Sequence, residues 1–211
     1  MRKVWMYIDG FNFYYGVNAR RELPLGLGWC DFRKLATQHL IGEDCTLEKI
    51  KYFTSPVGKV LSYQGEEYRQ SRWLEAIKTI SNLEVIEGFH VPDDDKFRQE
   101  KQTDVKIAIE IVLDAMLPNG YDAAILVSAD IDLAPAVLAV QTRIPNRKPV
   151  HVWTPLSKPS SRWAELVRNQ GVVCQEIRPE MLADSRLPDR IIPKNGDTPI
   201  DCLPSWKMPE K

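Results

Sequence analysis

Short hydrophobic segments alternate with longer segments of helical periodicity along most of the chain. Residues 123–127 (AAILV) are apolar on both sides, which is typical of a strand buried between two helical layers. The other strand-like segments are 4–8, 50–57, 83–90, 150–153 and 172–177, and the helical periodicity covers 64–80, 103–117, 132–141 and 160–169. Strands that alternate with helices predict βαβ units. We therefore expect a three-layer α/β/α sandwich with a mainly parallel central sheet.

The end of the chain follows another pattern. From about Asp184 it contains five prolines and no helical or strand period. Because such a segment cannot build a core of its own, we predict a domain over residues 1–183 and an extended Pro-rich arm over residues 184–211. Its hydrophobic residues, Trp206 among them, indicate that the arm packs against the domain or against a second chain. The sequence leaves two alternatives for a second chain: the arm could hold another copy of this protein in a homo-oligomer, or it could hold a different protein.

Composition places the chain among ordinary globular proteins. Its 211 residues carry 28 Lys and Arg against 29 Asp and Glu, a net charge of −1. This balance excludes a protein that holds polyanions through bulk positive charge, but it allows a local nucleic-acid site.

The termini and cysteines favour a soluble, cytoplasmic protein. Asp9 interrupts the first hydrophobic segment too early for a signal peptide, and no segment has the roughly 20 apolar residues of a membrane helix. The four cysteines lie far apart without a C-x-x-C pair, so we expect free thiols and no zinc site, although spacing alone leaves disulfides open.

Carboxylates follow the predicted strands where an α/β sheet binds its ligands, beyond the carboxyl ends of the strands. Asp9 follows the first strand, and Asp130 and Asp132 follow the buried strand. Asp104 opens the helix over 103–117 and lies on its core-facing side. Three separate segments thus direct acids toward one edge of the sheet.

A divalent cation would relieve the repulsion among four such acids. Oxygen ligands without His or Cys favour Mg²⁺ or Mn²⁺. Each acid also has a structural interpretation: Asp9 begins a turn, and Asp104 and Asp132 suit the first turn of a helix. The joint placement favours the metal site.

Three sequence blocks resemble a known family. IDGFNFYYG (residues 8–16), EKQTDVKIAIEIVLDAM (100–116) and AILVSADIDLAPAV (124–137) are similar to the signature blocks of NYN domains, in the LabA-like branch of the PIN-like nuclease superfamily. KYFTSPV, EYRQSRWLEAI and KPVHVWTP fit the same branch, so that the resemblance covers roughly residues 1–177.

The resemblance implies an endoribonuclease that depends on Mg²⁺ or Mn²⁺. The family's acids, which serve both catalysis and metal binding, match Asp9, Asp104, Asp130 and Asp132, and its supporting residues match Asn12, Lys101 and Ser128. Asp114 also matches a recurrent acid of the family. It lies about 80° around the helix from Asp104, however, so we interpret it as a structural hydrogen-bonding partner.

With no His or Lys placed as a base, the metal would have to activate the water that attacks the phosphodiester. We expect in-line hydrolysis that leaves a 5′-phosphate and a 3′-hydroxyl, on single-stranded or loop regions of RNA. The residues that we expect to hold the substrate are Arg69, Arg72, Tyr14, Lys158 and Arg162, with Phe11 and Tyr15 either stacking on bases or packing against the helix.

Two other functions are weighed against this one. A non-catalytic RNA-binding or protein-binding regulator with a PIN-like fold would use the arm for partners, but the complete acid set speaks against it. A different phosphotransfer enzyme is less well supported, because Asp9-Gly10-Phe11 lacks a D-x-D nucleophile motif and no Gly-rich P-loop is present.

Overall fold

A computed structural model describes residues 1–18, 24–55, 65–91, 99–145, 148–193, 196 and 198–208, with backbone only at 25, 66, 89–91 and 99–101. Its centre is a six-stranded sheet of order β3-β2-β1-β6-β7-β8, in which all neighbours run parallel. The strands are β1 (Arg2–Asp9), β2 (Cys45–Thr54), β3 (Leu83–Glu87), β6 (Ala123–Val127), β7 (Val150–Pro155) and β8 (Val173–Ile177). The mainly parallel sheet predicted from the sequence is confirmed.

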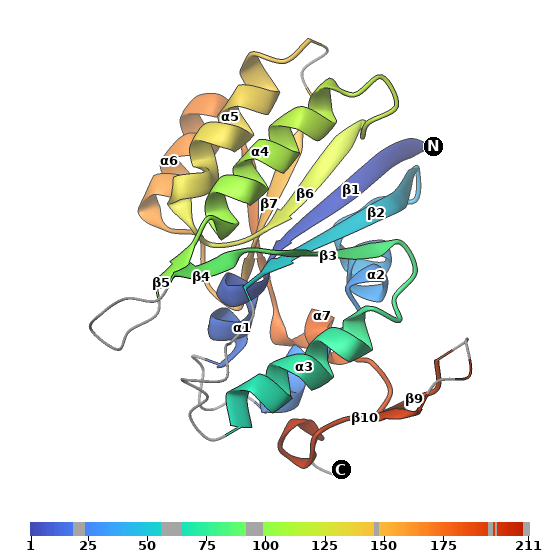
Figure 1. Ribbon diagram of the computed structural model, residues 1–211. Helices are drawn as coiled ribbons and strands as arrows, with labels where there is room; N and C mark the ends of the chain where they lie inside the picture. Colours follow the sequence, from blue (N-terminus) through green and yellow to red (C-terminus); the bar gives the residue numbers. More distant parts are fainter. Residues whose placement is uncertain are drawn as a thin grey trace.

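Helices cover both faces of this sheet (Figure 1). One face carries α1 (Gly10–Asn18), α2 (Phe32–Leu35), α3 (Glu66–Ile77) and α7 (Pro179–Asp184). The other face carries α4 (Thr103–Met116), α5 (Ala134–Thr142) and α6 (Ser161–Gln170). Short helical turns are η1 (Leu25–Gly28), η2 (Ala36–Leu40), η5 (Ile131–Leu133) and η6 (Pro204–Trp206). The structure is therefore the expected three-layer α/β/α sandwich.

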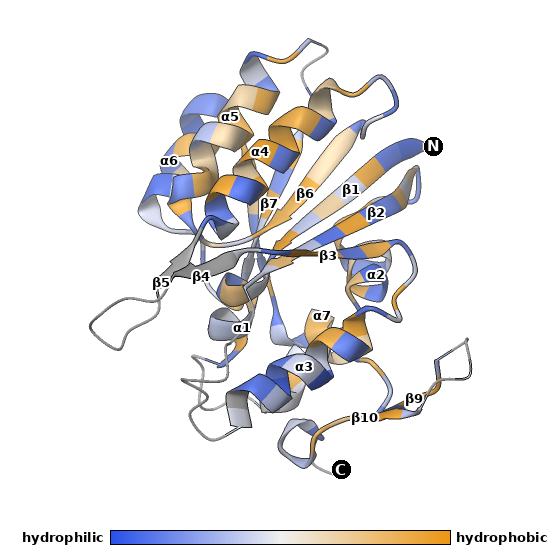
Figure 2. Ribbon diagram, in the orientation of Figure 1, coloured by the Kyte–Doolittle hydropathy of each residue, from blue (hydrophilic) through white to orange (hydrophobic). Residues whose placement is uncertain are grey.

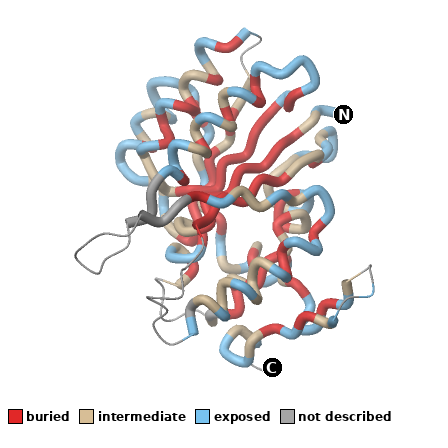
Figure 3. Tube along the Cα trace, viewed as in Figure 1, coloured by how far each residue is buried: buried red, intermediate tan, exposed pale blue. Residues whose placement is uncertain are grey.

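The side chains of β1 alternate between the two cores. Met6 and Ile8 lie in the core under α1, α2 and α3, whereas Trp5 and Tyr7 lie in the core under α4, α5 and α6. Because both faces are covered, the central strands β1 and β6 are buried along most of their length (Figure 3). Figure 2 shows that β6 is hydrophobic throughout, which is why its sequence predicted a fully buried strand.

Two predicted elements are divided in the structure. The expected strand over 83–90 ends as β3 at Glu87, and after Gly88 the chain continues as β4 (Phe89–Val91), which pairs antiparallel with β5 (Gln99–Lys101). The helix expected over 132–141 becomes the turn η5 followed by α5, with Pro135 near the start of α5. Proline fits the first turn of a helix because its missing N–H has no partner there.

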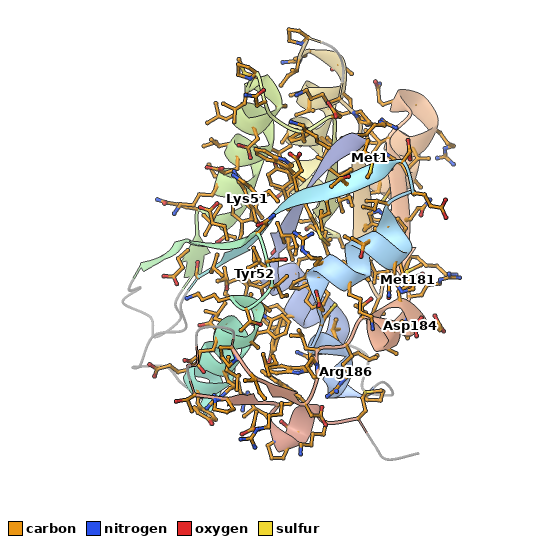
Figure 4. All side chains as sticks on the ribbon, turned by 90° about the vertical axis from the view of Figure 1, so that its right-hand side faces the viewer. Met1, Lys51, Tyr52, Met181, Asp184 and Arg186 are labelled. Carbon is orange, nitrogen blue, oxygen red and sulfur yellow. The ribbon has the colours of Figure 1, made fainter. Side chains whose placement is uncertain are left out.

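The C-terminal segment packs against its own chain. Arg186 donates hydrogen bonds to the backbone oxygens of Gly26 (3.3 Å) and Trp206 (2.8 Å), and the Trp206 ring lies 5.7 Å from that of Trp29. The segment is not wholly irregular, since β9 (Arg190–Ile191) and β10 (Ile200–Asp201) pair antiparallel. Figure 4 labels Arg186 near the start of this segment, close to Asp184.

In the described part of the chain, no helix combines the length and the hydrophobicity that crossing a membrane requires. The described cysteines are free thiols, two buried and two partly buried, as the sequence predicted.

Candidate functional site

Asp9 ends β1 and is fixed by its neighbours. Only 4% of its surface is exposed, and its carboxylate accepts the backbone N–H of Asn12 (3.0 Å) and the hydroxyl of Ser128 (3.0 Å). The side chain of Asn12 in turn accepts the backbone N–H of Ala129 (2.8 Å). These bonds join the end of β1, the first turn of α1 and the loop after β6, and they hold the Asp9 carboxylate in one orientation.

The loop after β6 is ordered by its own side chains. The Ser128 hydroxyl accepts the backbone N–H of Asp130 (3.0 Å), and Asp130 Oδ1 accepts the backbone N–H of Asp132 (2.9 Å). Trp163, buried at the start of α6, donates its indole N–H to the carbonyl of Ala129 (3.2 Å). The segment from Asp130 to Asp132 is therefore held by hydrogen bonds within the loop. Its backbone is also fixed at Ala129, which is bonded to Asn12 and to Trp163.

Asp104 comes to this loop from the first turn of α4. Partial burial, together with the negative charges of Asp130 and Asp132, raises the pKa of Asp104 above its usual value. The three carboxylates are thus close enough for their charges to interact. We expected Asp104 to face the core at its mouth. Its side chain is solvent-exposed, so the core-facing part of that expectation is wrong.

This donor set fits Mg²⁺ or Mn²⁺ in chemical type. It consists of carboxylate oxygens, and the charges of Asp130 and Asp132 add to burial in raising the pKa of Asp104, an effect that a bound cation would oppose. Within the described residues, no three His, Cys, Asp or Glu side chains are already gathered into a metal-binding group.

Asp114 has a different role from the other acids. It is buried and accepts hydrogen bonds from the Tyr7 hydroxyl (2.8 Å) and the Lys51 ammonium (2.5 Å), and Lys51 also contacts Glu110 of α4 (2.5 Å). Burial by itself would lower the pKa of Lys51, but its bonds to the two acids raise that pKa overall. The prediction that Asp114 is a structural hydrogen-bonding partner is confirmed.

A cavity of about 330 Å³ opens between α1, α3 and the end of β2. Gly10, the residue after Asp9, contributes to its lining, and we call it the aromatic cavity. It is lined by Gly10, Phe11, Phe13, Tyr14, Tyr15, Val17, Asn18, Gly28, Tyr52, Thr54, Arg69, Gln70, Trp73 and Trp206.

Of the residues expected to hold substrate, the cavity brings together Tyr14 and Arg69. Arg72 does not line it, because its guanidinium is bound to Glu75 (3.1 Å) and to the hydroxyl of Tyr68 (3.3 Å) on the surface of α3. Its position supports the alternative of a solvated helix face.

Two further expected substrate residues are near the acids. Lys158 and Arg162 are exposed before and at the start of α6, which the bond from Trp163 to Ala129 ties to the loop after β6. The predicted supporting residue Lys101 lies in β5, and its side chain is outside the described residues.

Sequence reasoning missed Tyr52, Gln70 and Trp73. Trp73 donates its indole N–H to the Tyr52 hydroxyl (3.0 Å), and Gln70 donates to the carbonyl of Ser55 (2.9 Å), so both bonds tie α3 to β2 at the cavity. The segments containing these residues had been noted, but a strand tyrosine and a helix tryptophan resemble ordinary core residues. Only the packing of α3 on β2 reveals them as a cavity wall.

A parallel α/β sandwich with acids at the carboxyl ends of β1 and β6 and at the start of α4 has the architecture of the PIN-like class. The chain belongs to the NYN domain family, whose pattern matches residues 3–169. It is also similar to 6-hydroxy-3-succinoylpyridine 3-monooxygenase HspA of Pseudomonas putida, with 26% identity over 95% of this chain and 74% of that protein.

The fold is also that of a known crystal structure. A protein of unknown function from Vibrio parahaemolyticus matches with a TM-score of 0.60 and 19% identity, over 88% of this chain and 96% of the other. At this identity the likeness concerns the fold alone. A nuclease-type domain therefore follows from the family, and no specific activity follows from either relative.

Proposed function

We propose that this protein is an endoribonuclease that requires Mg²⁺ or Mn²⁺. The observation that carries the proposal is the placement of Asp104 near Asp130 and Asp132, in addition to the fixed carboxylate of Asp9. Partial burial and the charges of these two acids together raise the pKa of Asp104. Membership of the NYN family, a nuclease-type domain, supports it.

Each acid has a place in the proposed chemistry. Asp9 and Asp130, both fixed by hydrogen bonds, would hold the cation together with Asp104 and Asp132. A bound divalent cation would supply Lewis-acid activation of water and charge neutralisation at a phosphodiester. Ser128 and Asn12 orient Asp9 by hydrogen bonds. The exposed side chains of Lys158 and Arg162 would attract the phosphates of the RNA.

The test is cleavage of end-labelled single-stranded RNA with Mn²⁺ or Mg²⁺, and with EDTA as the metal-free reference. We expect products with a 5′-phosphate and a 3′-hydroxyl, and loss of at least about 100-fold in rate for Asp9→Asn and Asp130→Asn, since metal-ion activation carries most of such a reaction. Asp122→Asn is the matched control: it is the same substitution at the opposite end of β6, where Asp122 accepts the backbone N–H of Lys3. Equal cleavage by all variants would refute the assignment.

A second candidate is a non-catalytic RNA-binding regulator with the same fold. It is favoured by the exposed cations Lys158 and Arg162 beside the loop after β6, which could bind phosphates without a metal. For such a protein, RNA binding would be the same with Mn²⁺ and with EDTA, and no RNA would be cleaved. The two candidates thus give opposite outcomes in one experiment.

A further inference from the structure

The aromatic cavity has the composition of a pocket for a flat, polar ring. Phe13, Tyr52, Trp73 and Trp206 contribute aromatic side chains from four different segments of the chain. Their π faces favour offset or edge contacts with another aromatic ring. At about 330 Å³, the cavity is within the range of about 300–1,000 Å³ typical of small-molecule sites, so it can take one ring system but not a helical duplex.

Polar groups are placed among these rings. Arg69 and Gln70 reach the cavity from α3, and Thr54 reaches it from the end of β2. A guanidinium suits a phosphate next to the ring, and amide and hydroxyl groups suit the edge of a nitrogen heterocycle. The chemistry of the lining is that of a nucleotide: a flat base with an adjoining phosphate.

The cavity approaches the site at Asp9. Gly10 lines the cavity and directly follows Asp9, and the Asp9 charge adds to burial in raising the pKa of Tyr52, another lining residue. A base held in the cavity would therefore lie on the Asp9 side of the acids. Tyr14 and Tyr15 stand at its exposed mouth, with 42% and 64% of their surfaces exposed.

The C-terminal arm completes the wall. Trp206 lines the cavity, and the carbonyl of Trp206 is held by Arg186. The arm also comes so close to η1 that a Cβ at Gly26 would lie 2.3 Å from the Trp206 carbonyl oxygen. The C-terminal arm therefore forms part of the wall of the aromatic cavity.

We propose that the aromatic cavity binds one unpaired base of the RNA strand, the base of a nucleotide next to the phosphodiester at the acids. This inference rests on the proposed function for its substrate class. The inference adds a reason for selectivity: the cavity would favour unpaired RNA, because a base must leave the helical stack before it can enter the cavity.

The experiment measures binding separately from cleavage. Tryptophan fluorescence is titrated in EDTA with a short single-stranded oligoribonucleotide, with the same strand carrying one abasic nucleotide, and with its duplex. Since Trp73 and Trp206 line the cavity, we expect quenching by the single strand, and weaker binding of the abasic strand and the duplex. AMP alone serves as the probe for a free nucleotide.

Variants locate the binding. Gly28→Leu should fill the cavity, because a Cβ at Gly28 meets only Val17 at 3.7 Å, and Tyr14→Ala removes a ring at the mouth. We expect each to weaken single-strand binding by about 5-fold or more, as expected for the loss of one base–aromatic contact. Tyr68→Ala is the matched control: Tyr68 is an exposed tyrosine (57%, against 42% for Tyr14) outside the cavity, and its loss should leave affinity unchanged.

The outcomes separate this inference from the proposed function. Metal-dependent cleavage with unchanged affinity in both cavity variants would overturn the cavity assignment and leave the nuclease intact. Binding that depends on the cavity without any cleavage would support the cavity and overturn the nuclease. If AMP binds in the cavity and the strand does not compete with it, the ligand is a free nucleotide and the strand assignment is wrong.

Discussion

The buried contact between Lys51 and Asp114 leads to the sharpest prediction about stability. Their exposed fractions are only 5% and 6%, and Figure 4 shows Lys51 on the α4 side of β2, with the next residue, Tyr52, on the α3 side. Asp114→Leu removes one of two carboxylates bound to Lys51 and the acceptor of the buried Tyr7 hydroxyl. An uncompensated buried charge destabilises a protein by about 3–5 kcal/mol.

Glu110 limits the effect, because its carboxylate still contacts Lys51 and its side chain is 35% exposed. We therefore expect a loss near the lower end of this range, about 3 kcal/mol. At about 2–4 °C per kcal/mol for a chain of this size, the Tm falls by about 6–12 °C.

Urea unfolding followed by circular dichroism measures this change. The control Glu110→Gln removes the more exposed partner and should lower the unfolding free energy by no more than about 1 kcal/mol. The triple variant Tyr7→Phe, Lys51→Met, Asp114→Leu replaces the whole polar group by apolar side chains and should recover most of the loss. A loss below about 1 kcal/mol for Asp114→Leu, or an equal loss for Glu110→Gln, would show that the network does not stabilise the fold in this way.

Three further predictions concern single positions. Gly10→Ala should lower the unfolding free energy by about 1–3 kcal/mol, because its Cβ would lie 2.6 Å from the carbonyl oxygen of Phe53; an unchanged urea midpoint would contradict this. Burial and the nearby Arg2 lower the pKa of His151 from 6.5, so the unfolded state binds more protons and stability is lost as the pH falls through about 6.5. His151→Gln should reduce this decline in a pH series of urea midpoints, and an identical decline in both proteins would refute the assignment. Burial raises the pKa of Cys174 to about 11, so iodoacetamide should modify it slowly at neutral pH and faster as the pH rises, as measured by mass spectrometry; modification at the rate of an exposed cysteine would contradict the prediction.

Much of the acidic edge could be predicted from the sequence. Asp9 and Asp130 follow segments whose hydrophobicity marks them as buried strands, and parallel strands end at the same edge of a sheet. The orientation of Asp114 followed from helical geometry alone. Periodicity is local, and where it is strong it fixes the element and the face of its central residues, as for Asp114, but not the exposure of a residue in the first turn such as Asp104.

Other features depend on contacts between distant segments. The break after β3 and the pairing of β4 with β5 require two segments to meet that have no periodic signal of their own. Arg72 and Arg69 lie three positions apart on one helix, yet only Arg69 lines the cavity, because Glu75 and Tyr68 hold Arg72 on the surface. No pattern of hydrophobic and polar residues distinguishes the two arginines.

The sequence by itself determined the layered α/β fold, the NYN family and the acids that lie at the ends of its strands. These features follow from short-range patterns of hydrophobic residues, which predict the buried strands and the buried faces of the helices. The tertiary structure alone decided that the acids would share one electrostatic environment at the rim of α4. It also decided that α1, β2, α3 and the C-terminal arm would enclose an aromatic cavity beside them. The physical reason is that charge coupling and cavity shape depend on distances between side chains far apart in the chain, and these distances are set only when the helices pack on the sheet.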